Sequence, residues 1–498
     1  MLPLLFNVAL MTTQGSPRGR LIVLFPSELV PIWLKIVTEQ RQYGTYDSTW
    51  KYISSATVGL TTHFNLDNGA DIAEDVLGSL HNATVFEPES FVVITIGKLG
   101  EILGLPLGRN LSRAFGQTFA VSPEIDDDDT VFVSHRGLLA TLVALVKSHG
   151  AIALTAFIRW WVLVIVGFLA DTDFIRKHAS DREINEVMSL VCTTEVEATY
   201  GLALSTADKE NFEEEELDGL REALENIKNT LVLGISHLVY LEDRAKELIM
   251  AHIRSIKTEL WGDLDNLKEG NESLPAFADF PVADGPFLRY WLSIREHALS
   301  LSSALRYRLP YVQRRTMPNT LFRYEPFSNA VVLNHAALTA PYYYTAGTKA
   351  MLYGGIGFWY ARTLAQALYI GPESVFVPEY AKTGGRPWAA LNDKGLLKRC
   401  SDGLFYNDDD GFPEMAAMEV AHAALERDDD HNRLPGAETL DTDHIFFMTL
   451  CYGSCRAEGG RRFSPSCNRA VLNSRIFARV LRCKSKPRLC GYFSPYIS

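Results

Sequence analysis

The chain has 498 residues, of which 60 are acidic and 48 basic, for a formal net charge of -12; the hydrophobic fraction is 47% and the charged fraction 22%. This length is ample for more than one domain with its own hydrophobic core, and the composition is that of an ordinary globular protein. An acidic surface argues against a nucleic-acid-binding protein, which presents a basic face to phosphate groups. We expect acidic runs such as Asp126–Asp129 to be solvated.

The cysteines and the glycosylation sequons indicate the cellular compartment in which the protein is found. The seven cysteines cluster toward the C-terminus, at Cys192, Cys400, Cys451, Cys455, Cys467, Cys483 and Cys490. Three Asn-x-Ser/Thr sequons begin at Asn82, Asn110 and Asn271. Local clustering of cysteines favours disulfides, and disulfides with sequons favour an oxidising, extracellular setting. The odd count leaves at least one thiol without a partner in the chain.

Residues Ala151–Ala170 form an almost continuous apolar stretch, for which a buried helix and a membrane span are the two interpretations. Its length matches a membrane span of about 20 residues. Arg159 stands near its middle, where a charge in lipid is costly. We therefore expect a buried helix, with a membrane span as the alternative.

The middle of the chain is predicted to be helical. Leucine and isoleucine recur at three-and-four spacing in Asn211–Leu260, after an acidic start. A loop rich in Gly, Pro, Asn and Asp, Trp261–Pro286, follows as the best domain boundary, and a pair of helices is predicted from Phe287 to about Arg308. Apolar and β-branched residues between prolines in Tyr324–Tyr344 predict a strand, and the next helix should start near Phe358.

No complete catalytic or nucleotide-binding motif is present. The sequence has no G-x-S-x-G elbow, no Walker loop, no G-x-G-x-x-G and no H-E-x-x-H. No two of the twelve histidines are four residues apart, which a helical zinc site needs. His422 and His431, which flank an acidic run, are expected to be surface residues. These observations alone indicate a mostly helical globular protein.

Residues Tyr353–Gly357 read YGGIG, and they carry a family resemblance. They are similar to the start of the active-site helix in the neprilysin and endothelin-converting-enzyme family of zinc metallopeptidases, roughly Y-G-G-I-G-x-x-x-G-H-E-x-x-H-x-F-D. Upstream, Tyr324–Tyr344 resembles a strand-and-loop segment of the same family. Downstream, the segments with LPG at 434–436, Cys455 and FSPSCNR at 463–469 resemble its C-terminal motifs. The likeness is specific in the C-terminal third and looser before residue 260.

The resemblance implies a mainly α, α+β fold. It implies a large helical N-terminal domain over residues 1–265, a linker and helical connection over 266–318, and a thermolysin-like C-terminal domain with a small sheet over 319–498. We predict that this sheet lies beside the helix that starts near Phe358, and that the helix buries Ile356, Phe358 and Leu364. Compared with the family, an N-terminal part that includes the cytoplasmic tail and membrane anchor has no counterpart. A longer, anchored form would make this chain a plasma-membrane ectodomain.

The resemblance also implies a degenerate active site. The family's two zinc-binding histidines fall at Arg362 and Gln366, the general base falls at Thr363, and the third ligand falls at Asp410. Arginine stays protonated and cannot ligate zinc, so no metal or other cofactor is expected, although the family uses zinc. Glu414 takes the place of an aspartate that orients a histidine, and the transition-state histidine becomes Phe463.

The resemblance also assigns substrate-binding residues and a disulfide to positions in this chain. The family's polar substrate-gripping pair falls at Leu321 and Phe322, while Arg469 matches an arginine that binds the substrate carbonyl. The resemblance pairs Cys400 with Cys490. It leaves Cys192, Cys455 and Cys483 free or re-paired, and it gives no precedent for Cys451 and Cys467.

Three hypotheses follow. The first is a zinc-less, inactive pseudopeptidase that binds extracellular peptides or an active family relative. The alternatives are an active extracellular metalloendopeptidase with a rebuilt metal site, and a truncated product without function. For the first, we predict that Arg362 approaches the vacant metal position and pairs with Asp410, Glu414 or both, because buried carboxylates without a dication need another positive charge.

Overall fold

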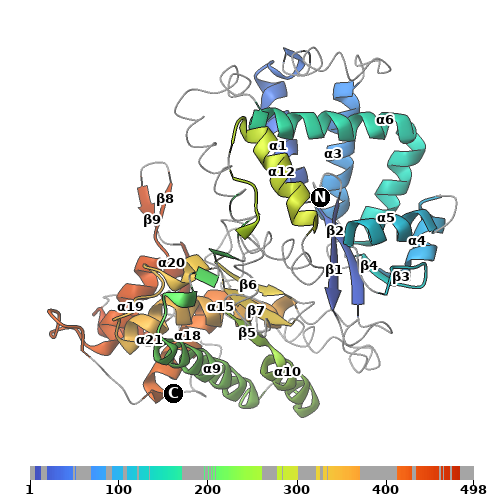
Figure 1. Ribbon diagram of the computed structural model, residues 1–498. Helices are drawn as coiled ribbons and strands as arrows, with labels where there is room; N and C mark the ends of the chain where they lie inside the picture. Colours follow the sequence, from blue (N-terminus) through green and yellow to red (C-terminus); the bar gives the residue numbers. More distant parts are fainter. Residues whose placement is uncertain are drawn as a thin grey trace. The chain divides into compact units, whose positions relative to one another are not determined.

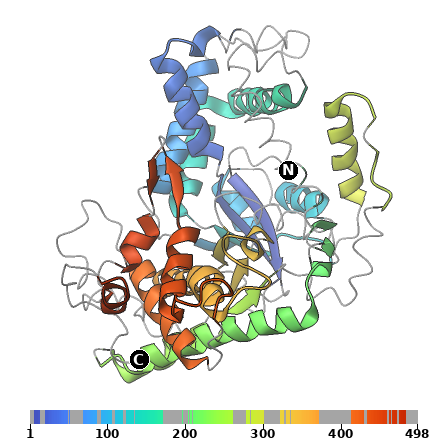
Figure 2. The same ribbon diagram turned by 90° about the vertical axis from the view of Figure 1, so that its left-hand side faces the viewer.

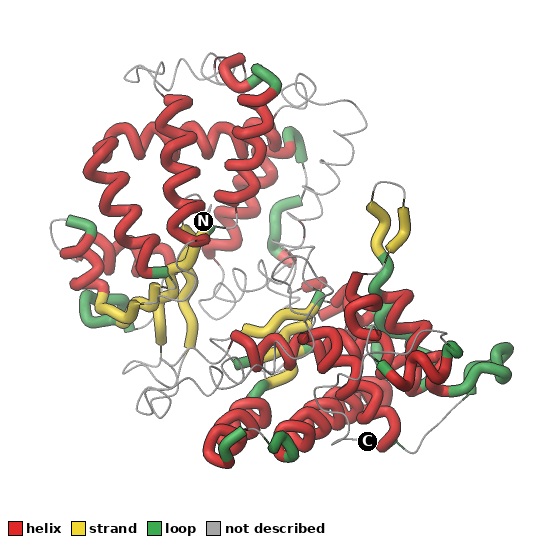
Figure 3. The backbone as a smooth tube through the Cα atoms, turned by 180° about the vertical axis from the view of Figure 1, so that it is seen from behind, coloured by secondary structure: helices red, strands yellow, loops and turns green. Residues whose placement is uncertain are grey.

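The computed structural model describes residues 6–12, 20–27, 29–48, 51, 69–85, 92–104, 109–119, 123–133, 135–170, 196, 200, 203–204, 206–207, 209–239, 241–260, 278–282, 284–300, 321–325, 329–333, 335–370, 412–428, 433–458, 461–463, 465–471 and 474–482. Helices predominate, and strands are confined to small sheets (Figure 1, Figure 3). The mainly α, α+β fold class is therefore confirmed.

The chain folds into two compact units. The first unit comprises Met1–Tyr200 and Pro275–Gln313, and the second comprises Gly201–Leu274 and Arg314–Ser498. This division differs from the expected boundary at residue 265. The reason is α9 (Glu214–Ser236), whose buried leucines and isoleucines pack on the C-terminal helices α15 and α18 (Figure 2).

The first unit contains a four-stranded sheet that the sequence analysis did not anticipate. Its order is β1 (Phe6–Thr12), β2 (Arg20–Pro26), β4 (Thr130–Val133) and β3 (Val92–Thr95). Strands β2 and β4 are parallel, and the other pairs are antiparallel. The apolar run of β2 is typical of a central strand that is covered on both faces.

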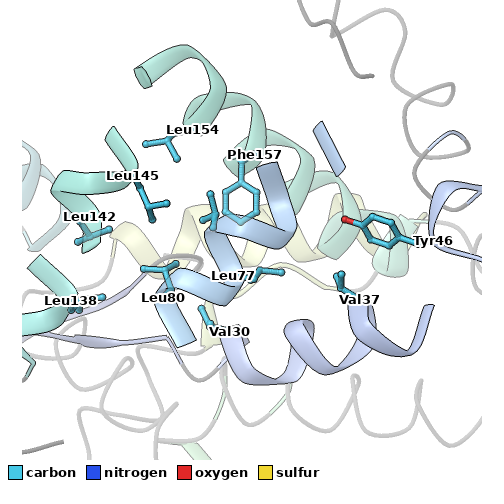
Figure 4. Close-up of a cluster of buried hydrophobic side chains, with 11 residues drawn as sticks. Val30, Val37, Tyr46, Leu77, Leu80, Leu138, Leu142, Leu145, Leu154 and Phe157 are labelled. Atoms are coloured by element: carbon cyan, nitrogen blue, oxygen red, sulfur yellow. The ribbon is translucent and has the colours of Figure 1, made fainter. Parts of the chain in front are cut away.

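The helices of the first unit are α1 (Leu29–Gln42), α3 (Gly69–Val85), α4 (Ile96–Ile102), α5 (Arg109–Phe119), α6 (Arg136–Ala170) and α12 (Phe287–Ser300). Two apolar clusters organise them: α4 and α5 pack on the sheet, and α1, α3 and α6 form a second cluster. Leu77 and Leu80 of α3 meet Val30 of α1 and Leu138 and Phe157 of α6 (Figure 4). These side chains are at most 4% exposed, so they form a core of their own.

The apolar stretch Ala151–Ala170 forms the second part of α6, after a bend at Gly150, whose φ of 77° suits a glycine. None of the helices in the described part of the chain is long and apolar enough to cross a membrane.

One residue of the acidic run Asp126–Asp129 is buried, against expectation. Asp129 is 2% exposed and accepts hydrogen bonds from Arg20 Nε at 2.8 Å and Nη2 at 2.6 Å. Arg20 also donates to the carbonyls of Pro123 and Glu124. Arg20 thus connects the acidic loop to β2. Its guanidinium also supplies the hydrogen-bond donors that a buried carboxylate needs.

The second unit is built around a three-stranded sheet. Its order is β5 (Lys257–Glu259), β7 (Ala330–Leu333) and β6 (Phe322–Glu325), with β5 parallel and β6 antiparallel to β7. The helices are α9, α10 (Asp243–Ser255), α14 (Lys349–Leu352), α15 (Phe358–Ile370), α18 (Phe412–Arg427), α19 (Thr442–Gly453), α20 (Pro465–Val471) and α21 (Arg475–Val480). A hairpin of β8 (Arg456–Glu458) and β9 (Arg461–Phe463) lies between α19 and α20 in the chain.

Helix α15 lies beside this sheet, as predicted. It begins at Phe358, and Ile356, Phe358 and Leu364 are each fully buried. Its contacts reach β6 and β7 on one side and α18 on the other (Figure 1). The central position of α15 makes it the element on which the candidate site is built.

A buried histidine network joins α10 to the sheet. His252 is 4% exposed, and its Nε2 lies 3.2 Å from Tyr324 Oη. Tyr324 donates to Asn329 Oδ1 at 2.9 Å, and Asn329 Nδ2 donates to Ser255 Oγ at 2.8 Å. Burial lowers the pKa of His252 to about 4, because a charged imidazole loses its hydration there.

Candidate functional site

Glycine is required at two positions before α15, because the backbone there lies very close to the backbone of other segments. Tyr353–Gly357 forms a short π-helical turn that bends at Gly355. A Cβ on Gly354 would collide with the carbonyl oxygen of Phe446, and one on Gly355 with that of Tyr342. Ile356 N donates to the same Tyr342 oxygen at 2.7 Å. The YGGIG motif therefore has a structural role that is independent of metal chemistry.

Helix α15 presents Arg362 and Gln366 on one face, since they are four residues apart. Both side chains are partly exposed, whereas Thr363 is 1% exposed. The Thr363 hydroxyl donates to the Trp359 carbonyl of its own helix at 3.0 Å. Thr363 is therefore a buried helix residue without the means to accept a proton from water.

The Arg362 guanidinium pairs with a buried carboxylate. Arg362 Nε donates to Glu414 Oε1 at 3.0 Å, and Glu414, in the first turn of α18, is 2% exposed. The guanidinium carbon lies 5.6 Å from the centre of the Trp359 ring. The predicted pairing of Arg362 with Glu414 is confirmed. Asp410, the other proposed partner, lies outside the described residues.

Arg469 approaches the same carboxylate from α20. Its Nη1 is 3.8 Å from Glu414 Oε1, and its side chain is 27% exposed. Two guanidinium groups thus converge on one glutamate oxygen. We call Arg362, Glu414 and Arg469 the arginine–glutamate cluster.

A disulfide that the resemblance did not provide holds α20 near this cluster. Cys467, two residues before Arg469, is bonded to Cys451 in α19, with the two Cα atoms 4.8 Å apart. Cys455 is a free, exposed thiol that donates to the Cys451 carbonyl at 3.3 Å. The bridge closes the segment that contains the β8–β9 hairpin, so it restricts where Arg469 can lie.

An aromatic wall connects the cluster to the sheet. Phe322 of β6 stacks with Trp359 of α15, with ring centres 6.3 Å apart and planes 15° apart. Tyr342 meets both rings edge-on. The resemblance assigns a polar substrate-binding pair to Leu321 and Phe322, and in the structure the Phe322 ring packs against Trp359 and Tyr342.

Other predicted residues are placed less completely. Phe463 belongs to β9, but its side chain is not described. Cys400, Cys490, Cys192 and Cys483 lie outside the described residues, so the predicted Cys400–Cys490 bridge stays a prediction. Trp359, which the sequence analysis did not single out, lines the site. Its position three residues before Arg362 on the same helix was the available signal.

His422 differs from expectation, because it is 1% exposed instead of a surface residue. Its Nε2 lies 2.9 Å from Asp443 Oδ1, and its ring stacks on Phe447. The hydrogen bond with His422 lowers the pKa of the Asp443 carboxyl below its usual value. The pair joins α18 to α19, so it supports the helix that carries Glu414.

The chain matches no protein-family model and no curated protein sequence. Solved structures do match. PepO from Lactobacillus rhamnosis is 14% identical with a TM-score of 0.58, over 98% of this chain and 80% of that one. The Mycobacterium tuberculosis zinc metalloprotease Zmp1, in complex with an inhibitor, is 13% identical with a TM-score of 0.59, over 96% and 78%. A structure of the Haemonchus galactose-containing glycoprotein complex is 13% identical with a TM-score of 0.61, over 97% and 79%.

The chain has a neprilysin-like fold. These likenesses extend over nearly all of this chain, and PepO and Zmp1 share the fold that the YGGIG resemblance implies. Because the sequence identities to these structures are only 13–14%, the likeness establishes the fold and not the function.

The residues at the two positions that the resemblance assigns to zinc-binding histidines do not fit a zinc ion. Among the described residues, no three His, Cys, Asp or Glu side chains form a group that could hold a metal. The first of these positions holds Arg362, a permanent cation whose Nε donates a hydrogen bond to Glu414. Gln366, on the second position, offers a neutral amide, which is a poor zinc ligand. We derive no catalytic step through a metal at this site.

Proposed function

We propose that this protein is a pseudopeptidase, a neprilysin-like chain that binds peptides without hydrolysing them. The observation that carries the proposal is the ion pair of Arg362 with Glu414 at 3.0 Å, at the position that the resemblance assigns to the first zinc-binding histidine. A guanidinium there repels a dication and uses the carboxylate that would otherwise support a metal ligand.

The state of the other positions supports the same proposal. Water activation needs a base, and the base position holds Thr363, whose hydroxyl is buried and bonded to its own helix. Losing one ligand could be compensated by a neighbour. Losing two ligands together with the base removes both the Lewis acid and the proton acceptor.

Binding is the function that the remaining elements can perform. Among the described strands, β6 is at the edge of its sheet, and an edge strand can pair with an extended peptide. The aromatic wall of Phe322 and Trp359 and the partly exposed Arg362 lie beside that edge. The ligands we propose are extracellular peptides, with an active family relative as a second kind of partner.

An extracellular location is part of the proposal. The Cys451–Cys467 disulfide supports an oxidising compartment, where such bonds persist, and the three sequons are consistent with secretion.

Metal analysis combined with a cleavage assay tests the proposal. The purified full chain should hold well under one equivalent of tightly bound zinc, and it should not cleave bradykinin-like or enkephalin-like peptides in a chelator-sensitive manner. The double variant Arg362→His with Gln366→His should also stay inactive, because Thr363 and Phe463 remain. One equivalent of bound zinc with chelator-sensitive cleavage by the unmodified chain would instead establish an active peptidase with a rebuilt site.

A further inference from the structure

Basic residues are concentrated in the C-terminal part of an otherwise acidic chain. Residues 459–498 contain nine Lys and Arg residues and no Asp or Glu, whereas the chain as a whole has a formal net charge of -12. Within this part, residues 482–488 read RCKSKPR. Short runs rich in Lys and Arg are typical of segments that bind polyanions such as heparin or nucleic acid. The sequence therefore indicates a candidate surface for an anionic ligand.

Helix α21 places some of this charge on the surface of the second unit. Phe477 packs edge-on against Phe447 of α19, with ring centres 5.2 Å apart, so one side of α21 faces α19 (Figure 1). Arg475 and Arg479 are four residues apart and therefore share a face of the helix, and both are exposed. Arg482, directly after the helix, is exposed as well. We call Arg475, Arg479 and Arg482 the basic surface.

The backbone at the end of α21 favours a role for the Arg482 side chain. Arg482 has a φ of 51°, in the left-handed region that glycine usually occupies after the last turn of a helix. Its amide donates to the Arg479 carbonyl at 3.3 Å, which closes that turn. Glycine would end the helix in the same way without the steric cost of a Cβ. An arginine at such a position is an observation that points to a function of its side chain.

The contact between the basic surface and the neighbouring helix is weak. Arg479 Nη2 lies 3.9 Å from Asp443 Oδ2, but the arginine side chain is 72% exposed, so water screens the pair. The same carboxylate is shared with His422, whose Nε2 lies 2.9 Å from Oδ1. A ligand with several negative charges can therefore take over the Arg479 guanidinium at little cost.

A sulfated polysaccharide suits this surface better than other polyanions. Its charges repeat along a flexible chain, so they can follow arginines that are about 6 Å apart along a helix. Each guanidinium can donate two parallel hydrogen bonds to one anionic group. Anionic lipids are concentrated in the cytoplasmic leaflet, whereas the location proposed above is extracellular. The acidic remainder of the chain opposes the approach of long nucleic acids.

We propose that the basic surface binds sulfated polysaccharides and thereby retains the protein on the anionic polysaccharides outside the cell. This function uses no residue of the arginine–glutamate cluster, so it is additional to the proposed peptide binding. The choice of a polysaccharide over an anionic membrane rests on the proposed extracellular location.

Heparin is the probe for the first experiment, which uses the purified full chain. The chain is applied to heparin–agarose and to a sulfonate cation-exchange resin at about 0.15 M salt, where charges beyond about 8 Å are screened. We expect retention on heparin and elution at a clearly higher salt concentration than from the sulfonate resin. Equal elution from the two resins, or no retention on heparin, overturns the proposal.

Variants then assign heparin binding to the basic surface. The triple variant is Arg475→Gln, Arg479→Gln and Arg482→Gln, and the control, with the same change in net charge at exposed arginines of α5 and α10, is Arg113→Gln, Arg244→Gln and Arg254→Gln. The triple variant should lose at least about 10-fold in affinity for heparin in solution, because each cation near an anionic surface contributes about 5-fold. Circular dichroism confirms that both variants are folded. A loss in the triple variant no larger than in the control overturns the assignment.

A vesicle experiment separates the two sources of negative charge. Vesicles of phosphatidylcholine and phosphatidylserine should not sediment the unmodified chain at the same salt concentration. If the vesicles bind the chain as well as heparin does, an anionic membrane replaces the polysaccharide as the partner, and the proposal is wrong. The zinc and cleavage assays of the pseudopeptidase proposal do not involve heparin, so each proposal can fail without the other.

Discussion

Removing the Arg362 guanidinium should destabilise the second unit. In Arg362→Ala, Glu414 loses the 3.0 Å hydrogen bond while its side chain stays 2% exposed. Removing one partner of a fully buried ion pair costs about 3–5 kcal/mol, because the other charge stays desolvated.

Two features of this pair reduce that figure. The Arg362 side chain is 25% exposed, so water already screens its charge. Arg469 Nη1, at 3.8 Å from the same oxygen, still offers a compensating charge. We therefore expect a loss of about 1.5–3 kcal/mol, the range for hydrogen bonds to charged groups. For a unit of this size, each kcal/mol corresponds to roughly 2–4 °C in the midpoint of thermal unfolding.

The assay is thermal unfolding of Arg362→Ala, Glu414→Gln and the double variant, each at neutral pH. The double variant should be more stable than Arg362→Ala alone, because it leaves no charge buried. Arg254→Ala, at an exposed arginine on α10, should change the free energy of unfolding by less than about 0.5 kcal/mol. The reasoning is refuted if Arg362→Ala is as mild as this control, or if the effects of the single changes simply add in the double variant.

Three further predictions concern the same unit. Because the pKa of His252 falls from 6.5 to about 4 on folding, the unfolded state takes up a proton that the native state does not; the free energy of unfolding should decrease by about 1.4 kcal/mol per unit as pH falls from about 6.5 toward 4. Denaturant unfolding across this range should show a shallower decrease for His252→Gln, and an unchanged slope would contradict the assignment. Gly355→Ala should destabilise the unit by several kcal/mol or prevent folding, because its Cβ would collide with the Tyr342 carbonyl oxygen. In the control Gly219→Ala, the new Cβ meets no atom within 4 Å, so the substitution in α9 should stabilise the unit by about 0.5–1 kcal/mol. Similar thermal midpoints for the two variants would argue against the close approach at Gly355. Cys467→Ser should lower the free energy of unfolding by about 3 kcal/mol, because the bridge closes a segment of 16 residues, while Cys455→Ser should change it little; equal denaturation midpoints would show that the bridge is absent in solution.

Local patterns in the sequence determined the elements around the site. The YGGIG motif and the apolar spacing after it predicted a helix that starts at Phe358 and buries Leu364, because helical periodicity is set by residues within a turn or two of one another. The same periodicity placed Arg362 and Gln366 on one face. The chemistry of arginine then excluded it as a zinc ligand without any coordinates, since its charge does not depend on the surroundings at ordinary pH.

Contacts between distant segments were decided only by the tertiary structure. Asp129 differs from its acidic neighbours only because Arg20, far away in the chain, reaches it, and no local pattern shows such a pairing. In the same way, His422 is buried because α19 brings Phe447 and Asp443 against it, and α9 belongs to the second unit because α18 covers its apolar face. The resemblance gave Asp410, Glu414 or both as partners for Arg362, and the packing of α15 against α18 brings Glu414 within hydrogen-bonding distance, while Asp410 lies outside the described residues. Pairing over such separations depends on how helices pack, and packing is a property of the whole fold that periodicity along the chain does not carry.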